Sequence, residues 1–438
     1  MATGLASPER SQPHYVQSLR SLRAQAPATG RRTSVIESNM PDIEDFRRRV
    51  SAFLGSHGLP PRVAHGSDVT NASLFKSREE EIEEIPRAKE WRAVKYDAGF
   101  GWITGPTEYG GTGLPNEFEV VFDEMEGQYE VPNESCFAPG LEFVGPVIEQ
   151  YGNDRLRAST LPKLYRGDSI ACQLFSEPGA GSDLASLRTR AVPSDGWWTV
   201  SGQKLWTSRA HYSDIGLLLA RTGSEEDRHH AITAFVVDMH ASGVTVRPLR
   251  QMTGDAPFNE VFLDGVVLPD GNRLGDVNQG WGVAMSTLSR ERSAIARSER
   301  YRPGGLADIA SPMKIAQLID QCGRSTDPVT RQRWSDLYAR STAMRLTGER
   351  LHQAEMEDGA AGVAGGIGKV LLARNMSMAA DLIGDLLGAR TTADTGESWA
   401  TKWLPFLLGV PGLHIGGGTD QVILNSIAER ALGLPRSK

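Results

Sequence analysis

The sequence predicts a multidomain α+β protein in which a central β region separates two helical regions. Apolar residues recur every three or four positions up to about residue 165 and again after about residue 278. Between these regions, short apolar runs recur every 10–20 residues. The chain of 438 residues also exceeds the roughly 250–300 residues that one core can hold. We therefore expect an N-terminal helical domain over 41–167, a central antiparallel β-barrel over 168–272 and a C-terminal four-helix bundle over 273–438.

The first 40 residues are rich in Ser, Arg and Pro and contain few acidic residues. They have no apolar stretch of the kind that marks a secretory signal, and we expect a disordered tail. Met40 directly precedes a helical pattern and is a candidate for the natural start. Further helices are expected over 116–129 and 138–152.

The central region reads as a series of strands separated by Gly, Asp and Ser. The expected strands lie at 197–200, 215–220, 231–237, 244–246 and 261–263. No GxGxxG follows a strand and no GxxxxGK[ST] is present, so Rossmann and P-loop nucleotide sites have no support. The C-terminal helices are expected at 279–300, 305–323, 329–357, 366–388 and 419–432.

Composition excludes several classes of function. The net charge of −7 disfavours a general nucleic-acid-binding surface, and no apolar run is long enough to cross a membrane. The three cysteines lie far apart and have no clustered His partners, so we expect neither a disulfide scaffold nor a metal site. Their sparseness fits a reducing cytoplasm.

Two short segments could carry chemistry. The loop Phe175–Asp183 combines Gly and Ser, which can expose backbone N–H groups and a hydroxyl to a phosphate, although such loops are more often plain turns. In the segment Ser201–Ser208, Trp206 and Ser208 stand two apart on an expected strand and therefore on one face. Taken alone, a core tryptophan is the more common explanation than one that packs against a planar ring.

Together, these segments make the chain resemble the acyl-CoA dehydrogenase family. Further matching segments are Phe258–Phe262, Gly416–Gln421 and Ala428–Arg436, so the resemblance covers roughly 41–438 in one collinear order. The resemblance implies a noncovalent FAD between the β domain and the C-terminal bundle. It also implies α,β-dehydrogenation of an acyl-CoA thioester, with an electron-transfer flavoprotein as the usual electron acceptor.

The resemblance assigns roles to individual cofactor-binding residues. Phe175 and Ser176 would line the flavin edge, and Gly181 and Ser182 would lie near the pyrophosphate. Trp206 would lie against the isoalloxazine with Ser208 near N5, and Thr419 would also lie near FAD.

The catalytic base is expected at Glu291. Many family members carry a Glu where this chain has Gly417, whereas another group carries the base in a Glu-Arg pair on a C-terminal-domain helix, as in Glu291-Arg292. On a helix Glu291 would lie at the margin of an apolar stripe, where burial raises a carboxylate pKa, although a structural ion pair is the alternative. The resemblance further implies substrate contact by Arg292 and a thioester oxygen held by the Gly417 backbone N–H.

The assembly is expected to depart from the common homotetramer. Family members usually send an Arg and a Phe-Gly motif into the neighbouring FAD site, but 321–331 contains no Phe-Gly. The Gln-Ile-x-Gly-Gly motif with which family members also reach the neighbouring flavin is poorly matched at 385–389, which reads Asp-Leu-Leu-Gly-Ala. The chain looks like one subunit of the actinobacterial heteromeric dehydrogenases, some of which act on sterol side chains. A homotetramer and an α₂β₂ heterotetramer both stay open, with Arg324 or Arg331 as substitutes in the former.

Three readings of function therefore compete. The leading one is an FAD-dependent acyl-CoA dehydrogenase that uses Glu291. The second is an oxygen-using flavoenzyme on the same fold, either an oxidase or a monooxygenase, and the retained base disfavours the monooxygenase. The third is a non-catalytic subunit that completes the site of another chain.

Overall fold

The computed structural model describes residues 41–62, 74, 76–298, 306–358, 361–393 and 396–436. The expected disordered tail over 1–40 lies outside the described residues. A short N-terminal unit extends to Phe46, and the rest of the chain forms a second unit from Arg47 onwards. The boundary falls within the first described helix, and all later elements belong to the second unit.

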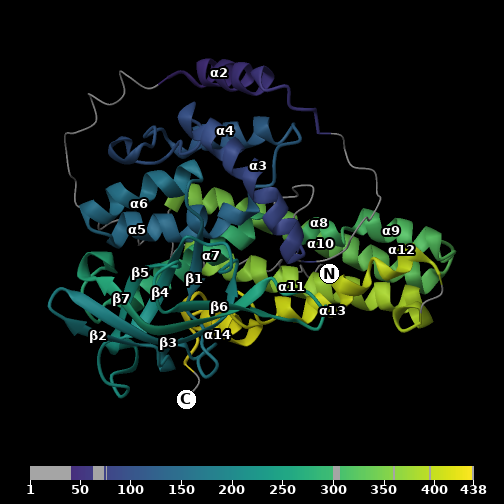
Figure 1. The fold of residues 1–438 in the computed structure, drawn as a ribbon. Coiled ribbons are helices and arrows are strands. Elements are labelled where there is room, and N and C mark those ends of the chain that lie inside the picture. The colour runs from purple at the N-terminus through teal and green to yellow at the C-terminus, as the bar shows by residue number, and fades with distance from the viewer. Residues whose placement is uncertain are drawn as a thin grey trace, which may run out of the picture. The chain divides into compact units, whose positions relative to one another are not determined.

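The N-terminal part is helical, as expected. Its helices are α2 (Ile43–Ser56), α3 (Arg78–Asp97), α4 (Asn116–Glu126), α5 (Gly145–Tyr151) and α6 (Asp154–Arg166) (Figure 1). Ser77 starts α3 with a capping box, in which its hydroxyl accepts from the Glu80 N–H while the Glu80 carboxylate accepts from the Ser77 N–H. The helix expected over 138–152 is present as continuous helical structure over 138–151, in which a π-helical turn over Gly140–Val144 leads into α5.

The central part is a mostly antiparallel sheet. Its strands are β1 (Ala171–Leu174), β2 (Arg190–Ser194), β3 (Trp197–Ser208), β4 (Ile215–Arg221), β5 (Ile232–Asp238), β6 (Val244–Leu249), β7 (Phe258–Pro269) and β8 (Arg273–Leu274). The order is β6-β7-β3-β2-β4-β5-β8, and β1 pairs with β4 outside this path. The β1–β4 and β2–β4 pairs are parallel. No pairing among the described strands joins β6 to β8, so hydrogen bonding leaves the expected barrel open.

The strands β4 and β5 are buried on both faces. Successive residues of β4 and β5 alternate between two apolar clusters, as the two-residue period of a strand requires. On one face, Leu219 and Val236 share a cluster with Ile148 of α5, Leu164 of α6 and Val283 of the first C-terminal helix. The N-terminal helices and the C-terminal domain therefore meet over the same face of the sheet.

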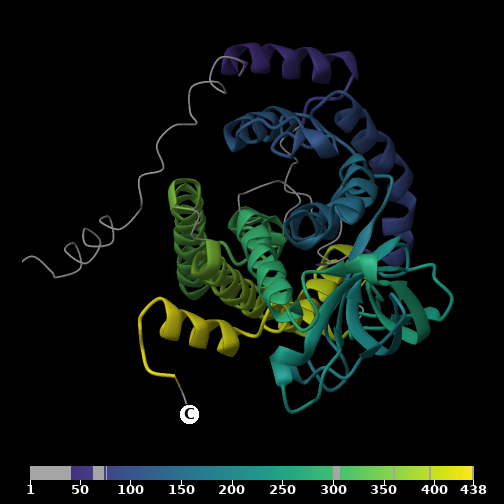
Figure 2. The same cartoon turned by 90° about the vertical axis from the view of Figure 1, so that its left-hand side faces the viewer.

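The C-terminal part is helical. Its helices are α7 (Gly280–Ser298), α8 (Leu306–Ile309), α9 (Pro312–Gln321), α10 (Pro328–Asp358), α11 (Ala361–Leu387), α12 (Ser398–Thr401), α13 (Leu404–Leu413) and α14 (Asp420–Arg430) (Figure 2). The single helix expected over 305–323 is two, because Ser311 and Pro312 start a new helix. Helix α13 has no counterpart among the helices expected from the sequence. None of the described helices is long and apolar enough to cross a membrane.

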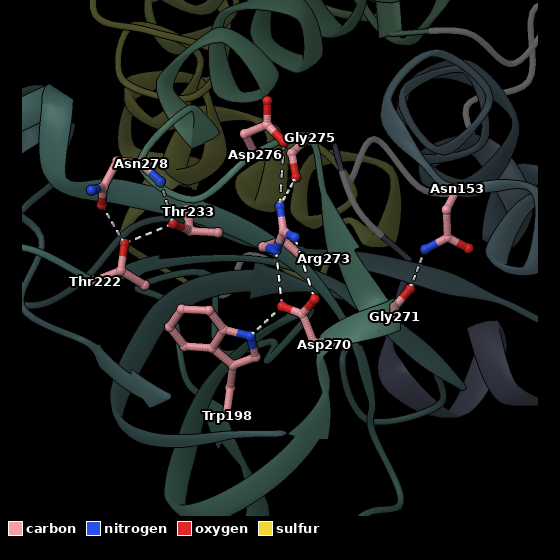
Figure 3. A network of polar contacts seen from close by, with 10 residues as sticks. All are labelled: Asn153, Trp198, Thr222, Thr233, Asp270, Gly271, Arg273, Gly275, Asp276 and Asn278. Atoms are coloured by element: carbon pink, nitrogen blue, oxygen red, sulfur yellow. Dashed lines mark hydrogen bonds and ion pairs between the residues drawn. The ribbon is translucent and has the colours of Figure 1, made fainter. Parts of the chain in front are cut away.

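A polar network fixes the passage from the sheet into α7 (Figure 3). Asp270 accepts hydrogen bonds from the Trp198 indole at 2.8 Å and from Arg273 at 3.0 Å. Farther along, the Asn278 N–H donates to the Thr233 hydroxyl at 2.8 Å. These contacts hold the start of α7 against β5 and thereby set where its later residues lie.

Candidate active site

The two segments that the sequence analysis singled out lie side by side. The Leu205 N–H donates to the Ser176 carbonyl at 2.8 Å, and the Lys204 ammonium donates to the Phe175 carbonyl at 3.1 Å. The loop after β1 and the second half of β3 therefore form one wall. Phe175 is buried in this wall, whereas Ser176 and Ser208 are half-buried.

A buried ion pair joins the two segments from within. Lys204 is 0% exposed, and its Nζ lies 2.7 Å from the Glu177 Oε1. Glu177 also accepts from the backbone N–H groups of Arg188 at 2.6 Å and Thr189 at 2.9 Å. Burial alone would raise the pKa of Glu177, but Lys204 and these hydrogen bonds hold it below its usual value. Burial lowers the pKa of Lys204, and the neighbouring Glu177 carboxylate opposes that shift.

This pair was not predicted from the sequence. Both residues stand inside the motifs quoted above, but they are 27 positions apart and belong to different segments. The available signal was that Lys204 falls on the same face of the expected strand as Trp198 and Val200, because a lysine on a buried apolar face needs a partner.

Trp206 presents its indole ring at a bulge in β3. The register between β3 and β7 shifts between Lys204 and Thr207, where β3 carries one more residue than its partner. Trp206 has φ +59°, which is rare for a bulky residue, and its side chain is exposed, at 54% for the residue. The ring lies edge-on to Phe258, with centroids 5.8 Å apart. Backbone strain of this kind is concentrated at functional sites.

The loop after β1 is open beside this wall. Gly181 and Ser182 are exposed, and a Cβ built at Gly179 or Gly181 would meet no atom within 4 Å. A planar ring that carries phosphates needs an aromatic surface, hydrogen-bond donors and room for the phosphates. Here these are provided by the exposed Trp206 indole, the half-buried Ser208 hydroxyl and the open Gly-Ser loop. The described residues therefore fit FAD.

Glu291 of α7 contacts β1, the strand that precedes this wall. It is half-buried, and the Gln173 side chain on β1 hydrogen-bonds its carboxylate. Burial raises the pKa of Glu291 above its usual value, while Gln173 and the neighbouring Arg292 oppose the rise. Arg292 is half-buried as well, and burial lowers its pKa. The structure thus brings the expected base to the strand that leads into Phe175, and Gln173 is a further residue that the sequence analysis did not assign.

Gly417 and Thr419 lie in the loop between α13 and α14. Gly417 has φ +69° and Gly418 has φ +96°, a conformation that favours glycine. The Thr419 hydroxyl caps α14 by accepting from the Val422 N–H at 3.3 Å. No hydrogen bond among the described residues joins this loop to Glu291 or Trp206. Its connection to them runs through α11, which contacts both α7 and α14.

The stretch 321–331 turns between α9 and α10 at the surface. Arg324 pairs with Asp327 of the same turn at 2.8 Å, and Arg331 contacts the Ser325 carbonyl at 3.4 Å. Both arginines are exposed. In the described part of the chain, no three His, Cys, Asp or Glu side chains gather in a group that could hold a metal ion.

Comparison with known proteins identifies the family. The acyl-CoA dehydrogenase N-terminal, middle and C-terminal domain models match residues 69–168, 172–266 and 278–432. The acyl-CoA dehydrogenase IpdE1 of Mycobacterium tuberculosis is 32% identical over 91% of this chain and 99% of its own length. The acyl-CoA dehydrogenase FadE34 of the same organism is 36% identical over 81% of this chain, and the match spans 47% of FadE34, about half its length.

The fold agrees with solved structures. The crystal structure of the ChsE4-ChsE5 complex from Mycobacterium tuberculosis contains a chain that matches with a TM-score of 0.64 and 25% identity. The match covers 93% of this chain and 100% of that one. With three domain models in collinear order and a relative matched over nearly its full length, the chain belongs to the acyl-CoA dehydrogenase family of flavoprotein oxidoreductases.

Proposed function

We propose that this chain is an FAD-dependent acyl-CoA dehydrogenase in which Glu291 removes the α proton of the thioester. The observation that carries the proposal is the position of Glu291. Its half-buried carboxylate is hydrogen-bonded by Gln173, two residues before Phe175 of the wall, and its pKa is raised by burial. A raised pKa brings a carboxylate closer to the operating pH, where a general base is most effective.

The residues around the base would divide the remaining work. Gln173 holds the Glu291 carboxylate through its side chain, which fixes the direction of the basic oxygen. Arg292 provides a neighbouring positive charge for the substrate. The Gly417 N–H would donate to the thioester oxygen and stabilise the negative charge that develops as the proton leaves. A backbone donor serves this purpose although Gly417 has no carboxylate.

The same wall would hold the cofactor. Trp206 and Ser208 would contact the isoalloxazine, Phe175 and Ser176 its edge, Gly181 and Ser182 the pyrophosphate, and Thr419 would lie nearby. FAD, when bound, supplies the hydride acceptor for the β hydrogen, and the protein supplies orientation and electrostatics. An electron-transfer flavoprotein is the proposed final acceptor.

The direct test is Glu291→Gln. We expect FAD to stay bound, because Glu291 lies outside the wall, while reduction of the flavin by an acyl-CoA panel falls about 10²–10⁴-fold. The measurement is stopped-flow flavin absorbance after mixing with each acyl-CoA. Reduction at the wild-type rate would show that the base lies elsewhere.

Glu149→Gln is the matched control. Glu149 of α5 is also half-buried, its pKa is also raised by burial, and Arg290 interacts with it as Arg292 does with Glu291. The same chemical change at this position should leave the flavin reduction rate within a few-fold of wild type. An equal loss in both variants would indicate a general effect of removing a half-buried charge.

We further propose that the FAD site is completed by a second, dehydrogenase-like subunit in an α₂β₂ tetramer. The stretch 321–331 has no Phe-Gly motif, and Arg324 is already engaged by Asp327. The ChsE4-ChsE5 structure, a complex of two different chains, supports the proposal by similarity.

The assembly is tested by purifying the chain alone and with a co-expressed second subunit. FAD stabilises only the assembly that binds it, so the chain alone should be poor in flavin or unstable. Native mass spectrometry and the ratio of flavin to chain are the measurements. A fully flavin-loaded, active homotetramer would refute the heteromer.

A further inference from the structure

A partly buried polar network lies at the base of the loop that contains Gly417. Lys369 of α11 is 3% exposed, and its Nζ lies 2.8 Å from Oδ1 of Asp420, the first residue of α14. The other oxygen of Asp420, Oδ2, lies 2.7 Å from His414 Nδ1. His414 Nε2 lies 2.6 Å from the Ser377 hydroxyl on α11. One helix therefore supplies both outer partners of a four-residue chain of contacts.

The protonation pattern of this network follows from its charges. Burial alone would raise the pKa of Asp420, but Lys369 and His414 hold it below its usual value, so the carboxylate is ionised. An ionised carboxylate only accepts, so His414 Nδ1 carries a proton and donates to Asp420. With a neutral imidazole, Nε2 then accepts from the Ser377 hydroxyl.

These contacts close the loop at its base. His414 and Asp420 flank residues 415–419, and besides their side-chain contact the Asp420 N–H donates to the His414 carbonyl at 3.2 Å. Within the loop, Gly417 and Gly418 have positive φ values. Because glycine has no Cβ, these two residues restrict their own backbone little and make no side-chain contacts. The order of the loop must come from its two ends and from the N–H groups of Ile415 and Gly416, which donate to the Gly412 carbonyl.

We propose that His414 and Asp420, held by Lys369 and Ser377, are positioning residues that aim the Gly417 N–H at the substrate. This inference rests on the proposed function, in which that N–H binds the thioester oxygen. A donor aimed at developing charge is effective only when it is already in place, and a displacement of about 1 Å can cost 10²-fold in rate. The network supplies that placement without touching substrate or cofactor.

The test uses His414→Gln in the FAD-loaded protein, with Lys314→Gln as the control. Lys314 belongs to a partly buried pair with Asp308 at 3.0 Å in the same domain, but on α9, so the control removes a comparable contact elsewhere. We expect amide exchange at Gly416–Gly418 to rise about tenfold in His414→Gln, the equivalent of one lost hydrogen bond. Exchange in α11 and α14 should stay the same, and the control should show no change in the loop.

The kinetic readout separates positioning from general structure. His414→Gln should keep its FAD and lower the limiting rate of flavin reduction about 10–100-fold, with a smaller change in the half-saturating acyl-CoA concentration. Asp420→Asn, which keeps the volume and loses the charge, should reproduce this pattern.

Three results would overturn the inference. They are unchanged loop exchange in His414→Gln, loss of FAD together with exchange rising throughout α11 and α14, and release of free CoA that disappears in Ser377→Ala, which would assign the network a hydrolytic role. A wild-type protein that no acyl-CoA reduces would refute the proposed function. The exchange measurement would still decide whether the network positions the loop.

Discussion

Two buried lysine–carboxylate pairs, one in the wall formed by the β1 loop and β3 and one at the start of α14, are built differently. At the sheet, Glu177 receives Lys204 and two backbone N–H groups, and Lys204 has no exposed surface. At the helices, Asp420 receives Lys369 and the His414 side chain, which is 34% exposed. The first pair is sealed by main chain, whereas the second ends in a side chain that reaches solvent. We therefore expect that removing one partner of the first pair costs most of its contribution to the free energy of unfolding. Removing one partner of Asp420 should cost only part of the contribution of the second pair.

The largest effect is expected from Lys204→Met. It leaves Glu177 buried without a cation, which typically costs about 3–5 kcal/mol. FAD should be lost as well if the proposed site is correct, because Lys204 of β3 binds the Phe175 carbonyl and Glu177 of the loop after β1. The measurements are urea unfolding and flavin content. The double variant Lys204→Met/Glu177→Gln should regain part of the stability, and a double variant no more stable than the single one would contradict the sealed-pair description.

A smaller loss is expected from Lys369→Met. Asp420 keeps one charged or polar partner, because His414 still donates to the same carboxylate, so the cost should be about 1–3 kcal/mol. Urea unfolding of Lys369→Met, His414→Gln and the double variant measures how much each partner of Asp420 contributes to the free energy of unfolding. A single Lys369→Met loss as large as that of Lys204→Met would remove the distinction between the two pairs.

Trp206→Ala tests the exposed part of the wall. The indole should contribute about 1 kcal/mol to FAD binding, or roughly a fivefold weaker Kd when it is removed. The stability of the flavin-free protein should not fall, because the exposed Trp206 ring buries little surface in its edge-on contact with Phe258. Fluorescence titration with FAD and thermal unfolding without FAD give the two numbers. Unchanged FAD affinity would argue against the placement of the isoalloxazine.

The smallest effect concerns Glu291, a carboxylate without a buried lysine. Its pKa in the folded protein is raised, so the folded state binds the proton more tightly than the unfolded state. The charged form is therefore penalised above the folded pKa, and the penalty vanishes below the unfolded value. Glu291→Gln should have a slightly higher Tm at pH 7–8, and the gain should disappear as the pH falls towards about 4. Glu177→Gln should change Tm in the opposite direction.

The order of helical, β and helical regions was predictable because it depends on local periodicity. The helix 116–129 and the strands at 215–220 and 231–237 were found where the apolar period indicated them. The helix α13 was missed because Pro405, Gly409 and Pro411 make its sequence read as a loop. Packing against the C-terminal core overrides that local preference, as the burial of Phe406 and Val410 shows.

The site was less predictable because it depends on long-range contacts. The motifs pointed to the segments around Phe175 and Trp206, and the structure places these side by side. The partners Glu177 with Lys204, Gln173 with Glu291, and Lys369 with Asp420 come from different elements, and no local pattern links them. The simple alternation that placed Trp206 and Ser208 on one face also ignored the bulge between Lys204 and Thr207.

That bulge is one of two that compensate each other along β3 and β7. Between Val200 and Gly202 the extra residue belongs to β7, and between Lys204 and Thr207 it belongs to β3, so the register at Ser208 equals that at Trp197. Deleting Leu205 would let Lys204 and Thr207 keep their partners Val261 and Asn259 at the two-residue spacing of a regular ladder, yet it would remove the bulge that presents Trp206 and leave the β7 bulge uncompensated. The length of β3 is therefore under tighter constraint than its composition, and insertions or deletions here should be far less tolerated than substitutions.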